Sequence, residues 1–261
     1  SLKSLAIEQL ALKSILKTNK ALVHDKIAKE EVNGRLQANE RALESELEGI
    51  FSKSKWVYCG RSYNAENLSS LISTFADDIY CKAPTIVNEL VNRNKPSGSA
   101  NAAIKKLVLA MAENYDEELL GLPEDTFPAE KGLYFSCLRN FGLHSEADSE
   151  WIFPTEVRNE LVNTLFSDTH ENVVLKAQSP VWLSDIDEFW AAPPYGLTKG
   201  IRSIWLMAFV LSHLKDYAFY DKNEATGEVI FITQPDDEFA LKLIQKPQNV
   251  AVQAIQMNKT R

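Results

Sequence analysis

Apolar side chains recur every three or four positions along residues 2–51. Leu5, Leu12, Leu16, Leu36 and Leu43 belong to this series, and no proline interrupts it. Such spacing places the apolar side chains on one face of an α-helix, so we expect one long helix or a helical hairpin. The pattern is most typical of a packed, coiled-coil-like stalk, and the alternative is a partner-binding helix with an exposed seam. The two descriptions are compatible.

An aromatic and β-branched run, KWVYC at residues 55–59, ends before Gly60 and predicts a strand. The sequence that follows alternates helical patterns with residues that begin or end helices. Asn67 is a candidate helix cap, Pro84 suits a first helical turn, and Pro96 ends a helix. The helices expected here are residues 67–80, 85–92 and 100–114.

The middle of the chain has the parts of a small winged-helix unit. A helical pattern at residues 130–141 closes on Gly142, and an aromatic strand follows at residues 151–153. Beyond it we expect a helix at residues 155–167 and a strand at NVVLKA, residues 172–177.

The last part repeats this order. Ile186, Phe189 and Trp190 mark one helix, and residues 199–215 mark a second, more apolar one. Two strand-like runs, YAFYD and VIFI, then flank a glycine-containing loop, which predicts a β-hairpin that would form a wing. The remaining expected elements are a helix at residues 236–245 and a strand at residues 249–255.

These elements predict a mainly α fold with small β-wings, in the α+β class. We expect a helical stalk at residues 1–54, a helical and winged-helix-like middle domain at 55–178, and a winged-helix-like domain at 179–261. With 261 residues, of which 45% are hydrophobic, the chain can bury a core. It begins with Ser1 inside a helical pattern, so we expect a fragment of a longer protein.

Nothing in the composition indicates a membrane or a secreted protein. The longest apolar run, IWLMAFVL at residues 204–211, is too short to cross a bilayer, and the first residues lack the apolar stretch of a signal peptide. Cys59, Cys81 and Cys137 lie far apart and show no disulfide or zinc spacing. We therefore expect a cytoplasmic protein that makes no membrane contact.

The net charge of −8 is unevenly distributed. Residues 1–110 hold 16 Lys and Arg against 12 Asp and Glu, whereas residues 111–178 hold 4 against 14 and residues 179–261 hold 8 against 10. An acidic middle repels a phosphate backbone, so only the first part of the chain could attract nucleic acid electrostatically.

Three phrases resemble a known family when read in order. They are YCKAPTIVNELVNRNKPSGSANAAIKKLVLAMAENYDEELLGL, then PAEKGLYFSCLRNFGLH, then PPYGLTKGIRSIWLMAFVLSHLKDYAFYDKN with FITQPDDEFALKLIQKPQNVAVQ. They are similar to a region of large bacterial phage-defence P-loop ATPases of the BREX BrxC/PglY type, over roughly residues 55–255. The resemblance implies a bacterial protein of antiviral defence in which an ATPase core precedes this region. It implies as partners the remaining domains of the parent ATPase and other subunits of the defence complex.

The chain departs from that family in its nucleotide chemistry. No Gly-x-x-x-x-Gly-Lys-Ser/Thr motif is present, and the nearest text, residues 95–99, lacks the lysine after glycine. We therefore expect that this chain alone has no enzymatic activity and binds no cofactor.

A basic turn at residues 93–99 is the first candidate site. Arg93 and Lys95 precede the expected helix at residues 100–114, whose free amides favour an anion, and Lys105 and Lys106 add charge along it. One interpretation is a contact to DNA phosphate or to a nucleotide on another domain. The other is a solvated connection between two helices, with Ser97 or Ser99 as the cap.

A second candidate lies at the start of the apolar helix before the expected wing. Lys199 and Arg202 could face a phosphate backbone together with Lys222 of the wing. Acidic residues surround that wing, which weakens DNA binding and favours a protein contact. They are Asp216, Asp221, Glu224 and Glu228.

No catalytic or metal motif stands out. Asp185, Asp187 and Glu188 point to different helix faces and are interpreted as capping or solvated charges. The four histidines have no nearby His or Cys in the sequence, and no Ser-His-Asp spacing or nucleophile elbow occurs. They are His24, His144, His170 and His213.

Three functional hypotheses follow. The first is a non-catalytic interaction fragment of the defence ATPase, which can also oligomerise through its N-terminal helix. The second is a winged-helix module that binds double-stranded DNA without sequence specificity through Arg93, Lys95, Lys105, Lys106, Lys199 and Arg202. The third, an unrecognised hydrolase or nuclease, has no motif behind it.

Overall fold

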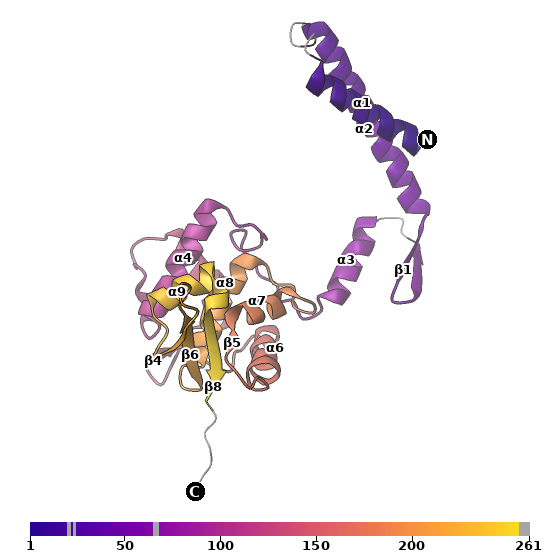
Figure 1. Ribbon diagram of the computed structural model, residues 1–261. Helices are drawn as coiled ribbons and strands as arrows, with labels where there is room; N and C mark the ends of the chain where they lie inside the picture. The colour runs from indigo at the N-terminus through magenta and orange to yellow at the C-terminus, as the bar shows by residue number, and fades with distance from the viewer. Residues whose placement is uncertain (20–21, 23–24, 65–67, 256–261) are drawn as a thin grey trace. The chain divides into compact units, whose positions relative to one another are not determined.

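The computed structural model describes residues 1–19, 22, 25–64 and 68–255. The chain divides into two compact units, Ser1–Asp78 and Ile79–Arg261, called here the N-terminal unit and the C-terminal unit (Figure 1). The fold is mainly helical with small antiparallel sheets, as the sequence predicted. Asn67, the expected cap, and His24 lie outside the described residues.

The N-terminal unit begins with a helical hairpin, so the second of the two sequence alternatives is confirmed. Its elements are α1 (Leu2–Thr18), α2 (Lys26–Lys53), β1 (Lys55–Tyr58), β2 (Arg61–Asn64) and α3 (Leu68–Ile79). Asp25 caps α2 by accepting a hydrogen bond from the Ala28 amide at 2.9 Å. The strand expected at residues 55–59 forms as β1, and a tight turn at Cys59 and Gly60 returns the chain as β2, which the sequence analysis missed.

The C-terminal unit alternates helices and short strands. Its helices are α4 (Gly98–Glu113), α5 (Ala129–Leu133), α6 (Glu160–Thr169), α7 (Leu183–Ala191), α8 (Lys199–Ser212) and α9 (Asp237–Gln245). Its short turns are η2 (Glu118–Gly121), η3 (Tyr134–Leu138), η4 (Arg139–Phe141), η5 (His170–Val174) and η6 (Pro247–Asn249). Its strands are β3 (Ser145–Ala147), β4 (Glu150–Ile152), β5 (Val181–Trp182), β6 (Tyr217–Lys222), β7 (Val229–Ile232) and β8 (Val250–Ala254).

Helix α8 lies at the centre of this unit. Every residue from Ile204 to Leu211 is buried, and α4, α7 and α9 all pack against the helix (Figure 1). The core around it is one cluster that runs from Val91 to Val252. The expected boundary at 178/179 therefore does not separate two cores, and the structure divides the chain at 78/79 instead.

The expected wing belongs to a larger sheet. Strands β6 and β7 form the predicted antiparallel hairpin, and β8 and β5 extend it in the order β5-β8-β6-β7. Strands β3 and β4 pair only with each other among the described strands. The winged-helix description of these hairpins stays a prediction.

The helix expected at residues 85–92 is absent. The Asn88 side chain accepts a hydrogen bond from the Leu90 amide at 2.9 Å and donates one to Ser136 Oγ at 2.7 Å. A short polar side chain that bonds its own backbone two residues on offers an alternative to a helical turn. The chain therefore enters α4 from an irregular segment, with Ser97 as the cap.

The strand expected at residues 172–177 is also absent. Residues His170–Val174 instead continue α6 as a wider π-turn, in which the Leu175 amide donates to the His170 carbonyl at 2.8 Å. This turn buries Val174 in the core. Tertiary burial therefore overrides the β-branched composition of the segment.

A helix that crosses a bilayer needs about 20 consecutive, mainly apolar residues. Within residues 1–19, 22, 25–64 and 68–255, no helix combines the length and the apolar character that crossing a membrane requires.

Candidate functional site

The basic turn lies against the start of α8. Thr198 Oγ1 donates a hydrogen bond to the Val91 carbonyl, and a Cβ on Gly200 would come within 2.9 Å of the Val91 Cα. Only glycine allows this close approach of helix and turn. The segment that carries Arg93 and Lys95 is thus held beside the residue that precedes Lys199 in the chain.

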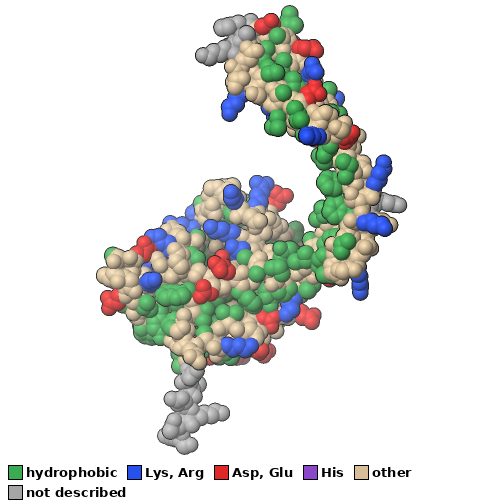
Figure 2. All heavy atoms as spheres, turned by 45° about the vertical axis from the view of Figure 1, so that its right-hand side comes forward, with side chains coloured by type: hydrophobic (Ala, Val, Ile, Leu, Met, Phe, Trp, Pro, Cys, Tyr) green, Lys and Arg blue, Asp and Glu red, His purple; other side chains and the backbone are tan. Residues whose placement is uncertain are grey.

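Three of the predicted cations are exposed at this junction. Arg93 has only a long ion pair, 3.9 Å, with Glu89, and both side chains are largely in water. Lys95 and Lys199 make no ion pair with any described residue. Figure 2 shows Lys and Arg side chains along the upper edge of the C-terminal unit, with acidic side chains among them. With Glu89 beside Arg93, the surface at the basic turn is mixed in charge.

Arg202 does not belong to that surface. Its Nε and Nη2 donate to the two carboxylate oxygens of Asp187 at 2.7 and 3.0 Å, and its Nη1 donates to the Leu197 carbonyl at 2.7 Å. Only 13% of the Arg202 side chain is exposed. The expectations for both residues were wrong, because Arg202 and the supposedly solvated Asp187 form an internal bidentate pair between α7 and α8.

The two lysines of α4 lie apart from the junction along the helix. Both are exposed, and Lys106 Nζ lies 3.3 Å from Glu130 of α5. Lys222 of the wing lies over the Trp182 ring at 5.7 Å. The structure therefore brings together Arg93, Lys95 and Lys199, whereas Lys106, Lys222 and Arg202 contact neighbouring elements.

A polar cluster fixes the segment that leads to the basic turn. Lys82 Nζ lies 2.8 Å from Asp168 of α6, and Tyr195 donates to the same carboxylate. The Lys82 amide also donates to the Pro194 carbonyl at 3.1 Å. These bonds tie Lys82 to α6 and to the loop before α8.

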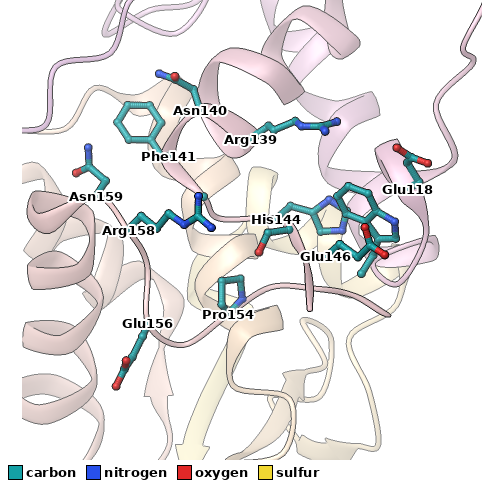
Figure 3. Close-up of a pocket in the computed structure, with 13 residues that line it drawn as sticks. Glu118, Arg139, Asn140, Phe141, His144, Glu146, Pro154, Glu156, Arg158 and Asn159 are labelled. Atoms are coloured by element: carbon teal, nitrogen blue, oxygen red, sulfur yellow. The ribbon is translucent and has the colours of Figure 1, made fainter. Parts of the chain in front are cut away.

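Sequence reasoning missed a pocket of about 640 Å³ beside the β3–β4 hairpin (Figure 3). Its walls come from η2, η4, β3, β4 and the loop that precedes α6. The lining side chains include Arg139, Arg158, Glu118, Glu146, His144 and Trp151. The volume is within the range of small-molecule sites. The glycine stop at Gly142 was visible in the sequence, whereas the π-turn at Tyr134–Leu138 that turns Arg139 toward the pocket was not.

Aromatic rings form the inner wall of the pocket. His144 is buried between Trp151 and Phe153, with ring centroids 5.1 and 4.8 Å away. The Arg139 guanidinium lies over the Trp151 ring at 5.6 Å and over the Phe135 ring at 5.8 Å. Such stacking orients a guanidinium and leaves its edge free to donate hydrogen bonds.

His144 is locked as a neutral ring. Its Nε2 lies 3.0 Å from the Tyr115 carbonyl, which only accepts, so Nε2 carries the proton and Nδ1 accepts from the Tyr134 hydroxyl at 3.0 Å. Burial lowers the pKa of His144 to about 4. Because both nitrogens are engaged, His144 shapes the pocket, while Arg139 and Arg158 can hold an anionic group and the glutamates a cationic one.

The locked histidine predicts a pH dependence of stability. The unfolded chain protonates His144 below about 6.5 and the folded chain only below about 4, so lowering the pH between these values favours unfolding. We expect the wild type to lose about 2–3 kcal/mol more than His144→Gln does in urea unfolding between pH 7 and 4.5. Glutamine keeps one acceptor and one donor but does not titrate. Equal losses in both proteins would contradict the assignment.

Comparisons with known proteins add no identification. No family model matches the chain, and neither a curated protein nor a solved structure matches it. Among the residues that the structure describes, no three His, Cys, Asp or Glu side chains are grouped as a metal site requires.

Proposed function

We propose that this chain is an assembly module of a bacterial phage-defence ATPase and that its N-terminal unit contacts another protein of the complex. The observation that carries the proposal is the exposure of apolar side chains in that unit. Leu12 is the only buried hydrophobic residue among the described residues 1–78. The exposed ones include Ile7, Leu10, Ile27, Val57 and Ile72, with exposed fractions of 58%, 69%, 81%, 71% and 54%.

In the α1–α2 hairpin, the side of α1 that faces away from α2 is exposed. Ion pairs between Arg35 and Glu8 at 2.9 Å and between Lys13 and Glu40 at 3.1 Å flank the contact between the two helices. At 100° per residue, Ile7 and Leu10 lie on the side of α1 opposite Leu12, which faces α2. Two helices that bury so little are marginal alone, and helical stability in proteins comes mostly from packing. A partner helix against Ile7 and Leu10 would supply that packing.

A buried polar residue supports a defined helix pairing. Asn39 of α2 is 6% exposed, and its Oδ1 has no hydrogen-bond partner among the described residues. A single buried asparagine costs stability and fixes register and partner choice in coiled coils. Residues 1–54 hold 9 Lys and Arg against 8 Asp and Glu, so charge neither drives nor prevents association.

The test is co-expression of the chain with the proteins encoded beside it, including the ATPase core, followed by affinity purification and light scattering. A complex of defined stoichiometry that depends on the exposed face of α1 would support the proposal. If none of these proteins binds the chain, the assembly function is refuted.

A second candidate function is contact with DNA phosphate at the junction of the basic turn and α8. It is favoured by one observation: the hydrogen bond between Thr198 and Val91 holds the basic turn beside the start of α8. The acidic character of the middle of the chain limits such a contact to this side.

Salt dependence tests the DNA contact. If Arg93, Lys95 and Lys199 each neutralise a phosphate, the slope of log K against log salt should be about −3. We expect the anisotropy of a labelled duplex to report binding at about 50 mM salt that weakens at about 200 mM. The triple variant Arg93→Glu/Lys95→Glu/Lys199→Glu should lose this binding, whereas Lys3→Glu/Lys29→Glu/Lys53→Glu, in the N-terminal unit, should keep it. No binding at the lower salt would remove this function.

A further inference from the structure

The four-stranded sheet of the C-terminal unit ends in an apolar edge. Strand β7 pairs with β6 and, among the described strands, with no other, so its second side offers unpaired amides and carbonyls. Val229, Ile230 and Phe231 are exposed by 43%, 46% and 61%. Three consecutive exposed apolar residues on an edge strand are unusual, because such an edge is a template for another strand.

Apart from its short length of four residues, β7 lacks the usual protections of an edge strand. Natural edges are blunted by lysine, by proline within the strand, by a bulge or by a covering element. Residues 226–235 contain one charged residue, Glu228, which precedes the strand, and Pro235 follows it. The pairing of β6 with β7 is regular from Phe219 to Lys222, without a bulge.

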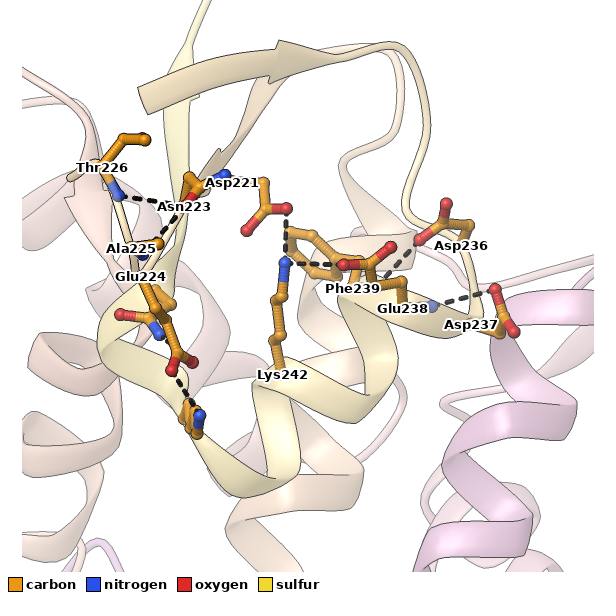
Figure 4. A network of polar contacts seen from close by, with 12 residues as sticks. Asp221, Asn223, Glu224, Ala225, Thr226, Asp236, Asp237, Glu238, Phe239 and Lys242 are labelled. Atoms are coloured by element: carbon orange, nitrogen blue, oxygen red, sulfur yellow. Dashed lines mark hydrogen bonds and ion pairs between the residues drawn. The ribbon is translucent and has the colours of Figure 1, made fainter. Parts of the chain in front are cut away.

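Ion pairs and a hydrogen bond tie the end of β6 and the β6–β7 loop to α9 and to Asn249 (Figure 4). Lys242 of α9 lies 2.6 Å from Asp221 at the end of β6 and 2.8 Å from Glu238. In the loop, Glu224 lies 2.5 Å from Lys246 and accepts from Asn249 at 2.8 Å. A partner strand therefore meets an edge that is already ordered, and the cost of ordering it on binding is small.

We propose that β7 pairs antiparallel with β7 of a second copy of this chain, which joins two four-stranded sheets into one. The two-fold axis of such a pair runs perpendicular to the sheet, so each face of one sheet continues into the same face of the other. Residues directly opposite each other share a face. A residue therefore lies on the axis opposite its own copy, and the longest overlap of β7 with its copy places Ile230 or Phe231, the two central residues of the strand, at that position.

Neither register, with Ile230 or with Phe231 on the axis, places like charges opposite each other. With Ile230 on the axis, Glu228 lies opposite Ile232, and with Phe231 on the axis it lies opposite Gln234. All other pairs within the strand are β-branched or aromatic, which are the pairs that stabilise sheets. Self-pairing therefore places no like charges directly opposite each other and requires no change in β7.

On one face of the sheet, a row of side chains that is aromatic except at Ala251 leads to this contact. Trp182, Ala251, Tyr220 and Phe231 lie in register across β5, β8, β6 and β7. The Tyr220 and Phe231 rings meet edge to face with centroids 6.1 Å apart. A second Phe231 across the axis extends this row, and aromatic cross-strand pairs add to the stability of a sheet.

Sedimentation velocity on the full chain over about 1–100 µM tests the proposal. We expect a monomer–dimer equilibrium, with a dissociation constant raised at least about tenfold by Phe231→Lys or Ile230→Lys, because each places like charges at or beside the axis. Leu175→Lys, at a position of similar exposure in the same unit, should leave the equilibrium unchanged. Circular dichroism confirms that each variant is folded.

Charge pairing identifies the register. A mixture of Phe231→Lys and Phe231→Glu chains should restore the dimer if Phe231 lies on the axis, and a mixture of Phe231→Lys and Val229→Glu should restore it if Ile230 does. A chain that stays monomeric at the highest concentration overturns the proposal. So does a dimer that is insensitive to the β7 variants but is lost in Ile7→Glu/Leu10→Glu, because its interface would then be α1.

Discussion

Replacing Trp205 with alanine should destabilise the whole C-terminal unit by about 3–5 kcal/mol. Trp205 is fully buried at the centre of α8, its Nε1 donates to the Cys137 carbonyl at 2.8 Å, and its ring meets Phe141 edge to face at 5.2 Å. The change removes this hydrogen bond and leaves a cavity between α8 and residues 137–141. Urea unfolding followed by circular dichroism measures the loss.

The same experiment tests whether the C-terminal unit is one domain. Because Trp205 and Cys137 lie on opposite sides of the expected 178/179 boundary, a single core predicts one shifted cooperative transition. Trp182→Ala is the matched control, since this half-buried tryptophan should cost much less. Two separate transitions, only one of which shifts, would contradict a single core.

The double substitution Ile7→Glu/Leu10→Glu should weaken binding of the partner protein by at least about 30-fold. Interface hot spots cost about 2 kcal/mol or more on truncation, and a buried unpaired carboxylate is costlier still. Both side chains are mainly in water in the free chain, so the substitution should change the stability of the chain itself by little. Calorimetric titration of the co-purified partner gives the two dissociation constants.

A matched pair of substitutions separates this effect from added charge. Val87→Glu/Leu175→Glu introduces two carboxylates at positions that are 88% and 50% exposed in the C-terminal unit. Partner binding should be unchanged in this control. Equal weakening by both double variants would mean that net charge, and not the apolar face of α1, determines the affinity.

The helices were the most predictable part of this fold. The repeats in residues 2–51 predicted α1 and α2, and the cap at Ser97 and the acidic start at Asp236 marked the beginnings of α4 and α9. These signals are local, since each lies within one or two helical turns. The start of α6 at Glu160 is also marked locally, because Asn159 caps the helix by accepting from the Val162 amide at 3.1 Å, and the expected start at residue 155 missed this signal.

The errors came from contacts that are distant in sequence. Asn88 bonds to Ser136, and this contact helps to replace an expected helix with an irregular segment. Arg202 was predicted to contact phosphate, but its guanidinium forms a bidentate ion pair with Asp187, fifteen residues earlier in the chain. The pocket beside His144 depends on Tyr115 and Tyr134, and no periodic pattern connects these residues.

Hydrogen exchange on the chain, alone and in complex with its co-purified partner, tests the central claim most directly. We expect the amides of α1 and α2 to exchange rapidly in the free chain and to become protected in the complex, while those of α8 are protected in both. Protection that appears instead at residues 88–106 and 198–202, or at the pocket around His144, would contradict the claim that the N-terminal unit is the assembly surface.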